Sequence, residues 1–277
     1  MATSSIQRAD LHMHSTASDG RMDPTALAQA AAKGGLELVS LTDHDTLAGW
    51  DAFQESALQA GLKCVPGVEI SAKQSDEEVH LVCYAFDTEH NGLHAFLALQ
   101  QQRRNERAQA FVTGFKQAGL LPESAQLQAG GDDTSWARPH IARLLIKHGV
   151  VKTMNEAFDR YLTPGSASFV EKPLPSGKEA ITVVHEAGGI ICLAHPGHHV
   201  SHDVVMGLVA EGLDGLEVVH PSHDDMLEEY YGSLADGKGL LKSGGSDFHA
   251  RPAHGERQLG DRWFTPEARL LSALRTH

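Results

Sequence analysis

The sequence predicts an α/β protein with a largely parallel sheet, either a (β/α) barrel or an open doubly wound sheet. Short apolar runs typical of buried strands alternate with helical patterns, which is the pattern of parallel βαβ units. A chain of 277 residues with 41% hydrophobic and 21% charged residues can also bury the core of one large domain with an insertion. The expected strands are RADLHMH (8–14), LELVSLT (36–42), LKCVPGVEI (62–70), EVHLVCYAF (78–86), GIICLAH (189–195), GLEVVH (215–220) and LLKSGGSD (240–247).

The connections between these strands define the order of elements. After the first strand, DPTALAQAAAKGG predicts a helix with Asp23 as N-cap, Pro24 in the first turn, and Gly34 or Gly35 at its end. Between residues 70 and 78 the chain is too short for a crossover helix. We therefore expect an antiparallel hairpin there, which makes any barrel irregular.

Residues 93–165 interrupt the alternation with a helical insertion. We expect one long helix over 93–119, a link QAGGDDTS, a second helix over RPHIARLLIKHG, and a third over MNEAFDRYL. The barrel would then consist of residues 8–92 and 166–277, and the insertion would form a cap over the substrate.

Composition restricts the partners and the compartment. The formal net charge of -13 argues against a broad basic surface for long duplex nucleic acid, although a local basic pocket could hold phosphates. Cys64, Cys83 and Cys192 lie in apolar runs, and an odd number of cysteines without close spacing indicates a reducing compartment. No apolar run is long enough to span a membrane, so we expect a cytoplasmic protein.

Histidines and carboxylates gather where the expected strands end. In a (β/α) barrel these ends form a single site, and the hairpin brings the start of its second strand, with His80, beside Glu69. Imidazole and carboxylate ligands without thiolates suit Zn, Mn or Fe, and they are too many for one ion, so two or three ions bridged by Glu69 or Asp247 are expected. The nine candidate ligands are His12, His14, Asp19, His44, Glu69, His80, His195, Asp247 and His249.

Six motifs in order resemble those of the PHP (polymerase and histidinol phosphatase) family of metal-dependent phosphoesterases. They are DLHMHSTASDG, SLTDHDT, GVEIS, HLVCYAF, LAHPG and GGSDFHA. The resemblance implies a distorted seven-stranded (β/α) TIM-like barrel and a site with three divalent metal ions, with Mn first and Zn or Fe as alternatives. The insertion resembles that of bacterial members that remove phosphate from nucleoside 3',5'-bisphosphates, some of which trim short RNA from its 5' end.

Guided by the resemblance, we group the ligands by ion. The first ion would take His12, His14, Glu69 and Asp247, the second Glu69, His80 and His195, and the third Asp19, His44 and His249. Such ions activate water for hydrolysis of a phosphomonoester. The residues expected to act in catalysis are Asp247, His249, His195 and His223.

Other polar residues are candidates for substrate contacts or support. His220 and His223 could protonate the leaving oxygen or bind phosphate, but a loop pair hydrogen-bonded to the backbone is the alternative. Asp43 and Asp45 flank His44 and could orient ligands. His198, His199 and His202 are expected in an exposed loop. The substrate-binding residues expected in the insertion are Arg104, Asn105, Arg107, Ser135, Arg138 and His140.

Several alternatives stay open. A short RNA or DNA oligonucleotide cut from its 5' end, or histidinol phosphate, would use the same metals. A metal-dependent amidohydrolase and a non-catalytic metal-stabilised module are further possibilities.

Overall fold

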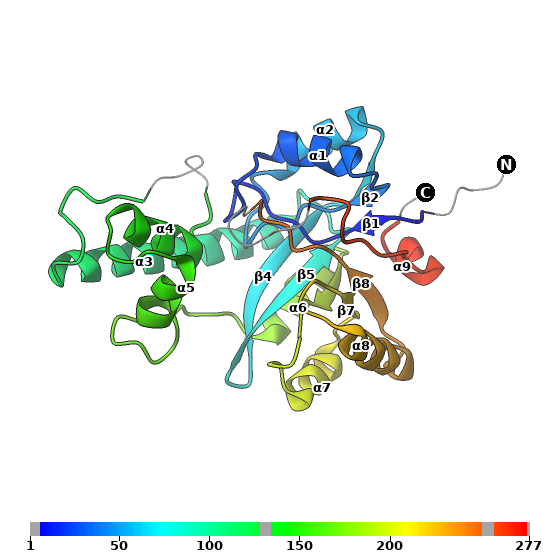
Figure 1. Cartoon of the computed structure of the whole chain (residues 1–277). Helices are drawn as coiled ribbons and strands as arrows, with labels where there is room; N and C mark the ends of the chain where they lie inside the picture. The colour runs from blue at the N-terminus through cyan, green and yellow to red at the C-terminus, as the bar shows by residue number, and fades with distance from the viewer. Residues whose placement is uncertain (1–5, 128–133, 251–257, 276–277) are drawn as a thin grey trace.

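The computed structural model describes residues 6–127, 134–250 and 258–275, and it confirms an α/β arrangement of short strands and helices (Figure 1). Three strands form a small parallel sheet in the order β1 (Ala9–Asp10), β2 (Leu38–Val39) and β3 (Lys63–Cys64). The connecting helices α1 (Pro24–Lys33) and α2 (Trp50–Gln59) pack on each other beside this sheet. Asp23 caps α1 as predicted, because its carboxylate accepts a hydrogen bond from Ala26 N.

A second, mixed sheet holds the remaining strands. The predicted hairpin is confirmed: the first two strands are antiparallel and joined by a tight turn. The second and third strands are also antiparallel, and the last two pairs are parallel. In order, the strands are β4 (Gly67–Gln74), β5 (Glu77–Tyr84), β6 (Ile190–Leu193), β7 (Gly215–Val219) and β8 (Leu241–Gly244). The accompanying helices are α6 (Gly177–Glu186), α7 (His202–Glu211), α8 (Asp225–Lys238) and α9 (Ala268–Ala273).

The prediction of a single strand over residues 62–70 is wrong. The segment forms two strands, β3 and β4, which belong to different sheets. Pro66 separates them, because proline has no N–H to donate to a continuous ladder. The described residues therefore contain eight named strands in two sheets, and no closed sheet is found among them.

Hydrogen bonds outside the regular ladders join the two sheets. Asp45 N donates to Glu69 O at 2.9 Å, and Asp247 N donates to His12 O at 2.8 Å. An apolar cluster fills the space between the sheets, with Leu11 and Leu38 from one side and Val82 and Cys192 from the other. These contacts hold the ends of β1, β2, β4 and β8 close together, and those ends carry most of the candidate ligands.

The insertion contains α3 (Asn91–Gln117), α4 (Arg138–Lys147), α5 (Met154–Ala157) and a π-helical turn, η1 (Phe158–Leu162). Figure 1 shows these helices to one side of the sheets. Phe111 and Phe115 of α3 pack with Ile141 and Leu145 of α4 in a separate core, whereas the first turns of α3 pack against the mixed sheet. The predicted link QAGGDDTS lies largely outside the described residues.

Two general features bear on the predicted compartment. No described helix is long and apolar enough to cross a membrane. Cys64, Cys83 and Cys192, all of which are described, are free.

Candidate metal centre and substrate cavity

The first ligand pair is positioned by the contact between the ends of β1 and β8. His14 N donates to Phe248 O at 2.9 Å, so the segment after β8 runs beside the segment after β1. Gly245 makes this approach possible, because a Cβ atom at that position would lie 2.4 Å from His12 Cβ. Asp247 is thereby placed with its Oδ1 3.1 Å from His14 Nε2 and 3.4 Å from His12 Nε2.

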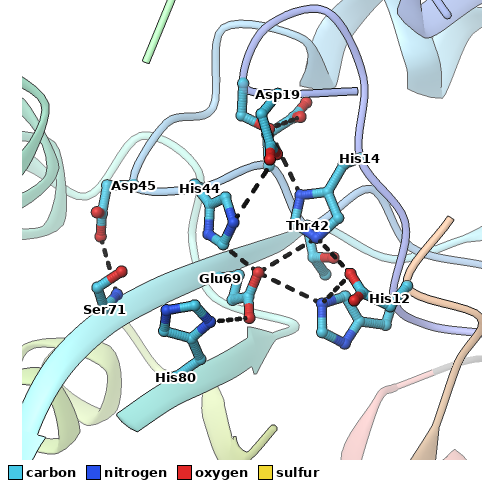
Figure 2. Close-up of polar contacts among 12 residues, drawn as sticks. His12, His14, Asp19, Thr42, His44, Asp45, Glu69, Ser71 and His80 are labelled. Atoms are coloured by element: carbon cyan, nitrogen blue, oxygen red, sulfur yellow. Dashed lines mark hydrogen bonds and ion pairs between the residues drawn. The ribbon is translucent and has the colours of Figure 1, made fainter. Parts of the chain in front are cut away.

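Glu69 of β4 lies at the centre of the cluster (Figure 2). Its Oε1 lies 2.9 Å from His80 Nδ1 and 3.0 Å from His195 Nε2. Its Oε2 lies 3.0 Å from His44 Nδ1, 3.2 Å from His14 Nε2 and 3.4 Å from His12 Nε2. The hairpin register, in which His80 faces Ser71 two residues beyond Glu69, brings His80 to this carboxylate as predicted.

The structure brings all nine predicted ligands together. Asp19 Oδ1 lies 3.1 Å from His249 Nε2 and 3.8 Å from His44 Nε2. In each of four overlapping groups, the ligand atoms lie within 4.8 Å of one another. The groups are His12, His14 and Asp247; His12, Glu69 and His195; His44, Glu69 and His80; and His14, Asp19, His44 and His249.

The donor set fits divalent metal ions. Among the described residues, His12 Nε2, His14 Nε2, His44 Nδ1 and Glu69 Oε2 are buried atoms without a hydrogen-bond partner. Buried polar atoms normally have partners, so lone pairs left converging on one another point to cations between them. Imidazole nitrogens and carboxylate oxygens without thiolates suit Mn, Zn or Fe.

Without metal, the histidines and carboxylates of the cluster shift each other's pKa. Burial works to lower the pKa of His14, but the nearby carboxylates of Asp247 and Glu69 outweigh it and raise the pKa to about 10. Burial works to raise the pKa of Glu69, but the charges of His44, His80 and His12 hold it well below its ordinary value. Metal binding at the His14 ring would therefore compete with a proton.

Asp43 and Asp45 support the site in different ways. Asp43 accepts hydrogen bonds from Ser15 Oγ at 2.6 Å and Ser18 Oγ at 2.5 Å, and Ser18 Oγ lies 3.4 Å from His14 Nδ1. Asp45 contacts no candidate ligand through these hydrogen bonds; it accepts one from Ser71 N (Figure 2) and binds Arg104 Nε at 2.5 Å. Asp43 thus reaches the candidate ligand His14 through Ser18, whereas Asp45 binds Arg104 of the insertion.

Replacing Asp45 with asparagine is expected to destabilise the metal-free protein by about 3 to 5 kcal/mol, because a buried charge pair loses one partner. Asp45 is fully buried, with Lys172 Nζ 3.4 Å away in addition to Arg104. Urea unfolding measures the change, and Asp51→Asn on the exposed face of α2 is the matched control. A difference between the two variants below about 1 kcal/mol, as for a surface pair, would contradict this expectation.

A cavity of about 230 Å³ opens beside the cluster and shares its walls with the insertion. Arg104, Arg107 and Arg138 line it together with seven of the nine candidate ligands. Trp136 and Phe158 add aromatic faces, and the Arg138 guanidinium lies 5.9 Å from the ring of Phe158. Lys172 is also in the wall, and burial together with Arg104 lowers its pKa to about 8.

Three other predicted substrate residues do not line this cavity. Asn105 Oδ1 accepts a hydrogen bond from Trp136 N at 3.3 Å. Ser135 is fully buried, and its N–H donates to Ala17 O at 2.9 Å. His140 Nδ1 accepts from Ala137 N at 3.0 Å, and burial together with Arg143 lowers the His140 pKa to about 4. Asn105 and His140 thus accept hydrogen bonds from backbone groups just before α4.

His220 and His223 have separate surroundings. His223 Nδ1 donates to Val218 O at 2.8 Å and His223 Nε2 accepts from Gly197 N at 3.1 Å, so both ring nitrogens are engaged by backbone groups. This geometry does not support the catalytic role predicted for His223 and favours the alternative of a backbone-bonded loop histidine. His220 Nε2, in contrast, lies 3.6 Å from Asp247 Oδ2. In the predicted loop, His198 and His199 are exposed, whereas His202 begins α7.

Sequence reasoning missed three residues near the centre. Glu217 of β7 is fully buried beside His12, and Asp10 of β1 accepts from the backbone N–H groups of His12 and Ser246. Lys172 lies in the segment that returns from the insertion. A carboxylate within an apolar strand run was an available signal for Asp10 and Glu217, because buried acids are rare unless they are paired.

Fold and site together define a class of α/β proteins with a cluster of candidate metal ligands at the strand ends. The chain belongs to the PHP domain family, whose profile matches residues 10–241. The match confirms the family that the six motifs predicted.

Two curated relatives cover most of the chain. A 3',5'-nucleoside bisphosphate phosphatase from Chromobacterium violaceum is 34% identical over 95% of this chain and 97% of its own length. The 5'-3' exoribonuclease Rnm of Escherichia coli (strain K12) is 36% identical over 87% of this chain and 84% of its own length. The solved structure of a predicted metal-dependent phosphoesterase from Bifidobacterium adolescentis superposes with a TM-score of 0.84 at 31% identity, covering 96% of this chain and 95% of that one.

Proposed function

We propose that this protein hydrolyses the 3'-phosphate of nucleoside 3',5'-bisphosphates, such as adenosine 3',5'-bisphosphate to AMP and phosphate. Membership of the PHP family makes it a hydrolase acting on phosphoric monoesters. The observation that carries the choice of substrate is the shared cavity, in which one wall is the candidate metal cluster and the other holds arginines of the insertion. Such a cavity can bind two phosphates of one small molecule, one at each wall.

Three divalent ions, with Mn first and Zn or Fe as alternatives, are part of this proposal. The position of Glu69 between five histidines supports a carboxylate shared between ions. The converging groups differ from the grouping given above, because His44 lies with Glu69 and His80, and His12 lies with His195. When bound, such ions supply positive charge to the phosphate oxygens and make a water acidic enough to attack at neutral pH. Asp247, His249 and His195 act as ligands at the reacting phosphate, and His223 is left out of the catalytic set.

The protein's own cations would hold the second phosphate. Arg104 and Lys172 share one buried acid, Asp45, and Arg107 and Arg138 face one acid of the cavity wall, Glu78. Leaving aside the acids of the candidate metal cluster, the four cations exceed these two acids by two charges, which suits a phosphate dianion. Trp136 and Phe158 offer surfaces on which a base can stack without its edge being read.

A phosphate-release assay tests the proposal. The Mn-loaded protein is given adenosine 3',5'-bisphosphate, mononucleotides, histidinol phosphate and 5'-phosphorylated oligonucleotides. We expect the highest kcat/KM with the bisphosphate and no release after chelation. Release from mononucleotides at an equal rate would contradict the role of the second phosphate.

A 5'-3' exonuclease acting on short oligonucleotides is the second candidate, favoured by the similarity to the exoribonuclease Rnm. It would use the same ions. The reacting phosphate would then be the first internucleotide linkage, and the 5'-phosphate of the oligonucleotide would be the second phosphate. Higher kcat/KM with a 5'-phosphorylated trinucleotide than with the bisphosphate would select this activity. Amide hydrolysis without phosphate release would instead favour an amidohydrolase. The absence of any turnover would favour a non-catalytic module.

Replacing Arg138 with alanine is expected to raise KM for the bisphosphate about 10- to 100-fold, the loss of one charged hydrogen-bonding group. KM for a simple phosphate ester should change little, because that substrate has no second phosphate. Steady-state kinetics with both substrates measures the difference. Arg103→Ala on α3, a residue that is absent from the cavity wall, is the control. Equal effects on both substrates would argue against this role for Arg138.

Three structural expectations also belong to the proposal. The two sheets, joined at their edges by hydrogen bonds, would act as an interrupted form of the predicted seven-stranded barrel. Residues 93–165 would act as a cap that closes the substrate cavity, which is consistent with Arg104, Arg107 and Arg138 in its wall. A cytoplasmic location stays a prediction from the cysteine pattern.

A further inference from the structure

Strand β7 places a buried carboxylate, Glu217, directly behind the cluster, although none of the nine candidate ligands belongs to this strand. Glu217 is 0% exposed. Its Oε1 lies 2.9 Å from His12 Nδ1, and its Oε2 accepts a hydrogen bond from the backbone N–H of His195 at 2.7 Å. The two oxygens of one carboxylate therefore serve two different candidate ligands.

The first contact determines which nitrogen of His12 faces the cluster. An ionised carboxylate only accepts hydrogen bonds, so His12 Nδ1 must carry the proton that it shares with Glu217. The other nitrogen, Nε2, lies 3.4 Å from Glu69 Oε2 and 3.4 Å from Asp247 Oδ1. In the neutral ring, Nε2 is then left with the lone pair that a metal ion requires.

The second contact supports an unusual backbone conformation. His195 has φ 27°, a value that residues other than glycine rarely adopt. This conformation follows β6 and directs the ring so that His195 Nε2 lies 3.0 Å from Glu69 Oε1. The hydrogen bond from His195 N to Glu217 stabilises this strained backbone conformation.

We propose that Glu217 is a positioning residue that orients two metal ligands at once, the ring of His12 and the backbone of His195. The ligand atoms of His12 and His195 lie within 4.8 Å of each other and of a Glu69 oxygen, so one side chain orients two neighbouring ligands. The inference rests on the proposed metal centre and adds to it a residue that touches neither ion nor substrate.

Glu217→Gln tests the proposal, because it keeps the size of the side chain and removes one acceptor. A glutamine has one oxygen, and its NH₂ group must face one of the two N–H donors. Either the His12 ring changes tautomer or the His195 N–H loses its partner. We expect the affinity for Mn²⁺, measured by chelator competition together with metal counting, to fall about 10- to 100-fold. Glu186→Gln, which removes an exposed acid of α6, should retain the affinity of the unchanged protein.

Wild-type Mn²⁺ affinity in Glu217→Gln, with only a lower melting temperature of the metal-free form, would mean a merely structural residue and would overturn the inference. If this variant does not fold, Glu217→Asp takes its place. Aspartate keeps both oxygens on a shorter side chain that cannot reach both partners, so unchanged Mn²⁺ affinity there would equally overturn it. Because the experiment measures metal binding, it tests the role of Glu217 even if the protein has no bisphosphatase activity.

Discussion

Glu69→Gln is expected to abolish binding of the full metal complement and to lower kcat/KM for the bisphosphate by at least about a hundredfold, more than the loss of an outer support costs. Glu69 is 1% exposed, and its two oxygens face five histidine nitrogens within 3.4 Å. Glutamine keeps only one oxygen and turns an NH₂ group toward nitrogens that must offer lone pairs. The substitution also removes the negative charge of Glu69, which the metal ions would share.

Metal counting after dialysis and steady-state kinetics with Mn²⁺ measure this effect. The control is Glu55→Gln, which changes an exposed carboxylate on α2. Circular dichroism of both metal-free variants shows whether the fold is kept. A Glu69→Gln protein that retains its metals and turns over the bisphosphate at the normal rate would remove the basis of the proposed metal centre.

Metal affinity is expected to rise about a hundredfold per pH unit between about pH 6 and about pH 8, because at least two protons leave when metal binds. In the metal-free protein the pKa of His14 is about 10, because the carboxylates of Asp247 and Glu69 outweigh the effect of burial. Burial also works to lower the pKa of His12, but Glu217, Glu69 and Asp247 hold it well above its ordinary value. Both shifts favour the protonated rings, and a protonated ring must lose a proton to bind metal.

The stability of the fold should depend on pH in opposite directions with and without metal. The raised pKa of His14 stabilises the metal-free protein fully below its ordinary value of 6.5, and this contribution is lost as pH rises toward about 10. Burial works to raise the pKa of Glu217, but His12 and His220 lower it to about 2, so its contribution is present above its ordinary value of 4.5 and is lost in acid. The metal-loaded protein should instead gain stability as pH rises, because binding strengthens.

Calorimetric titration of Mn²⁺ in buffers with different ionisation enthalpies counts the released protons directly. Melting curves of the metal-free and metal-loaded forms across the same pH range test the opposite slopes. Release of less than one proton, or parallel melting curves, would mean that the histidine and carboxylate pairs do not compete with metal.

The parts of the fold that depend on local patterns were predictable. Asp23 and Pro24 indicated the start of α1, and the short polar interval after Ser71 indicated the hairpin that brings His80 to Glu69. The split between β3 and β4 was missed, although Pro66 marks it, because an apolar run of normal strand length hides a break in hydrogen bonding. Which sheet a short strand joins depends on distant partners.

On the substrate side, neighbours in the sequence have different roles in the structure. Arg104 lines the cavity and Asn105 does not, because successive residues of a helix point about 100° apart. The motif placed both in one candidate set, and only the packing of α3 against the sheet separates them. Lys172 was missed because its segment resembles an ordinary return loop, and its burial against Asp45 depends on residues 127 positions away.

The sequence by itself determined the chemistry of the centre. Its imidazoles and carboxylates stand at strand ends, and backbone geometry brings strand ends together. Only the tertiary structure decided which atoms meet: that Glu69 lies between five histidines, that Glu217 supports His12 and His195 from behind, and that His223 is bound by backbone groups. The reason is that residue type and strand register follow from local sequence, whereas the direction of a buried side chain follows from packing of segments that are far apart in the chain.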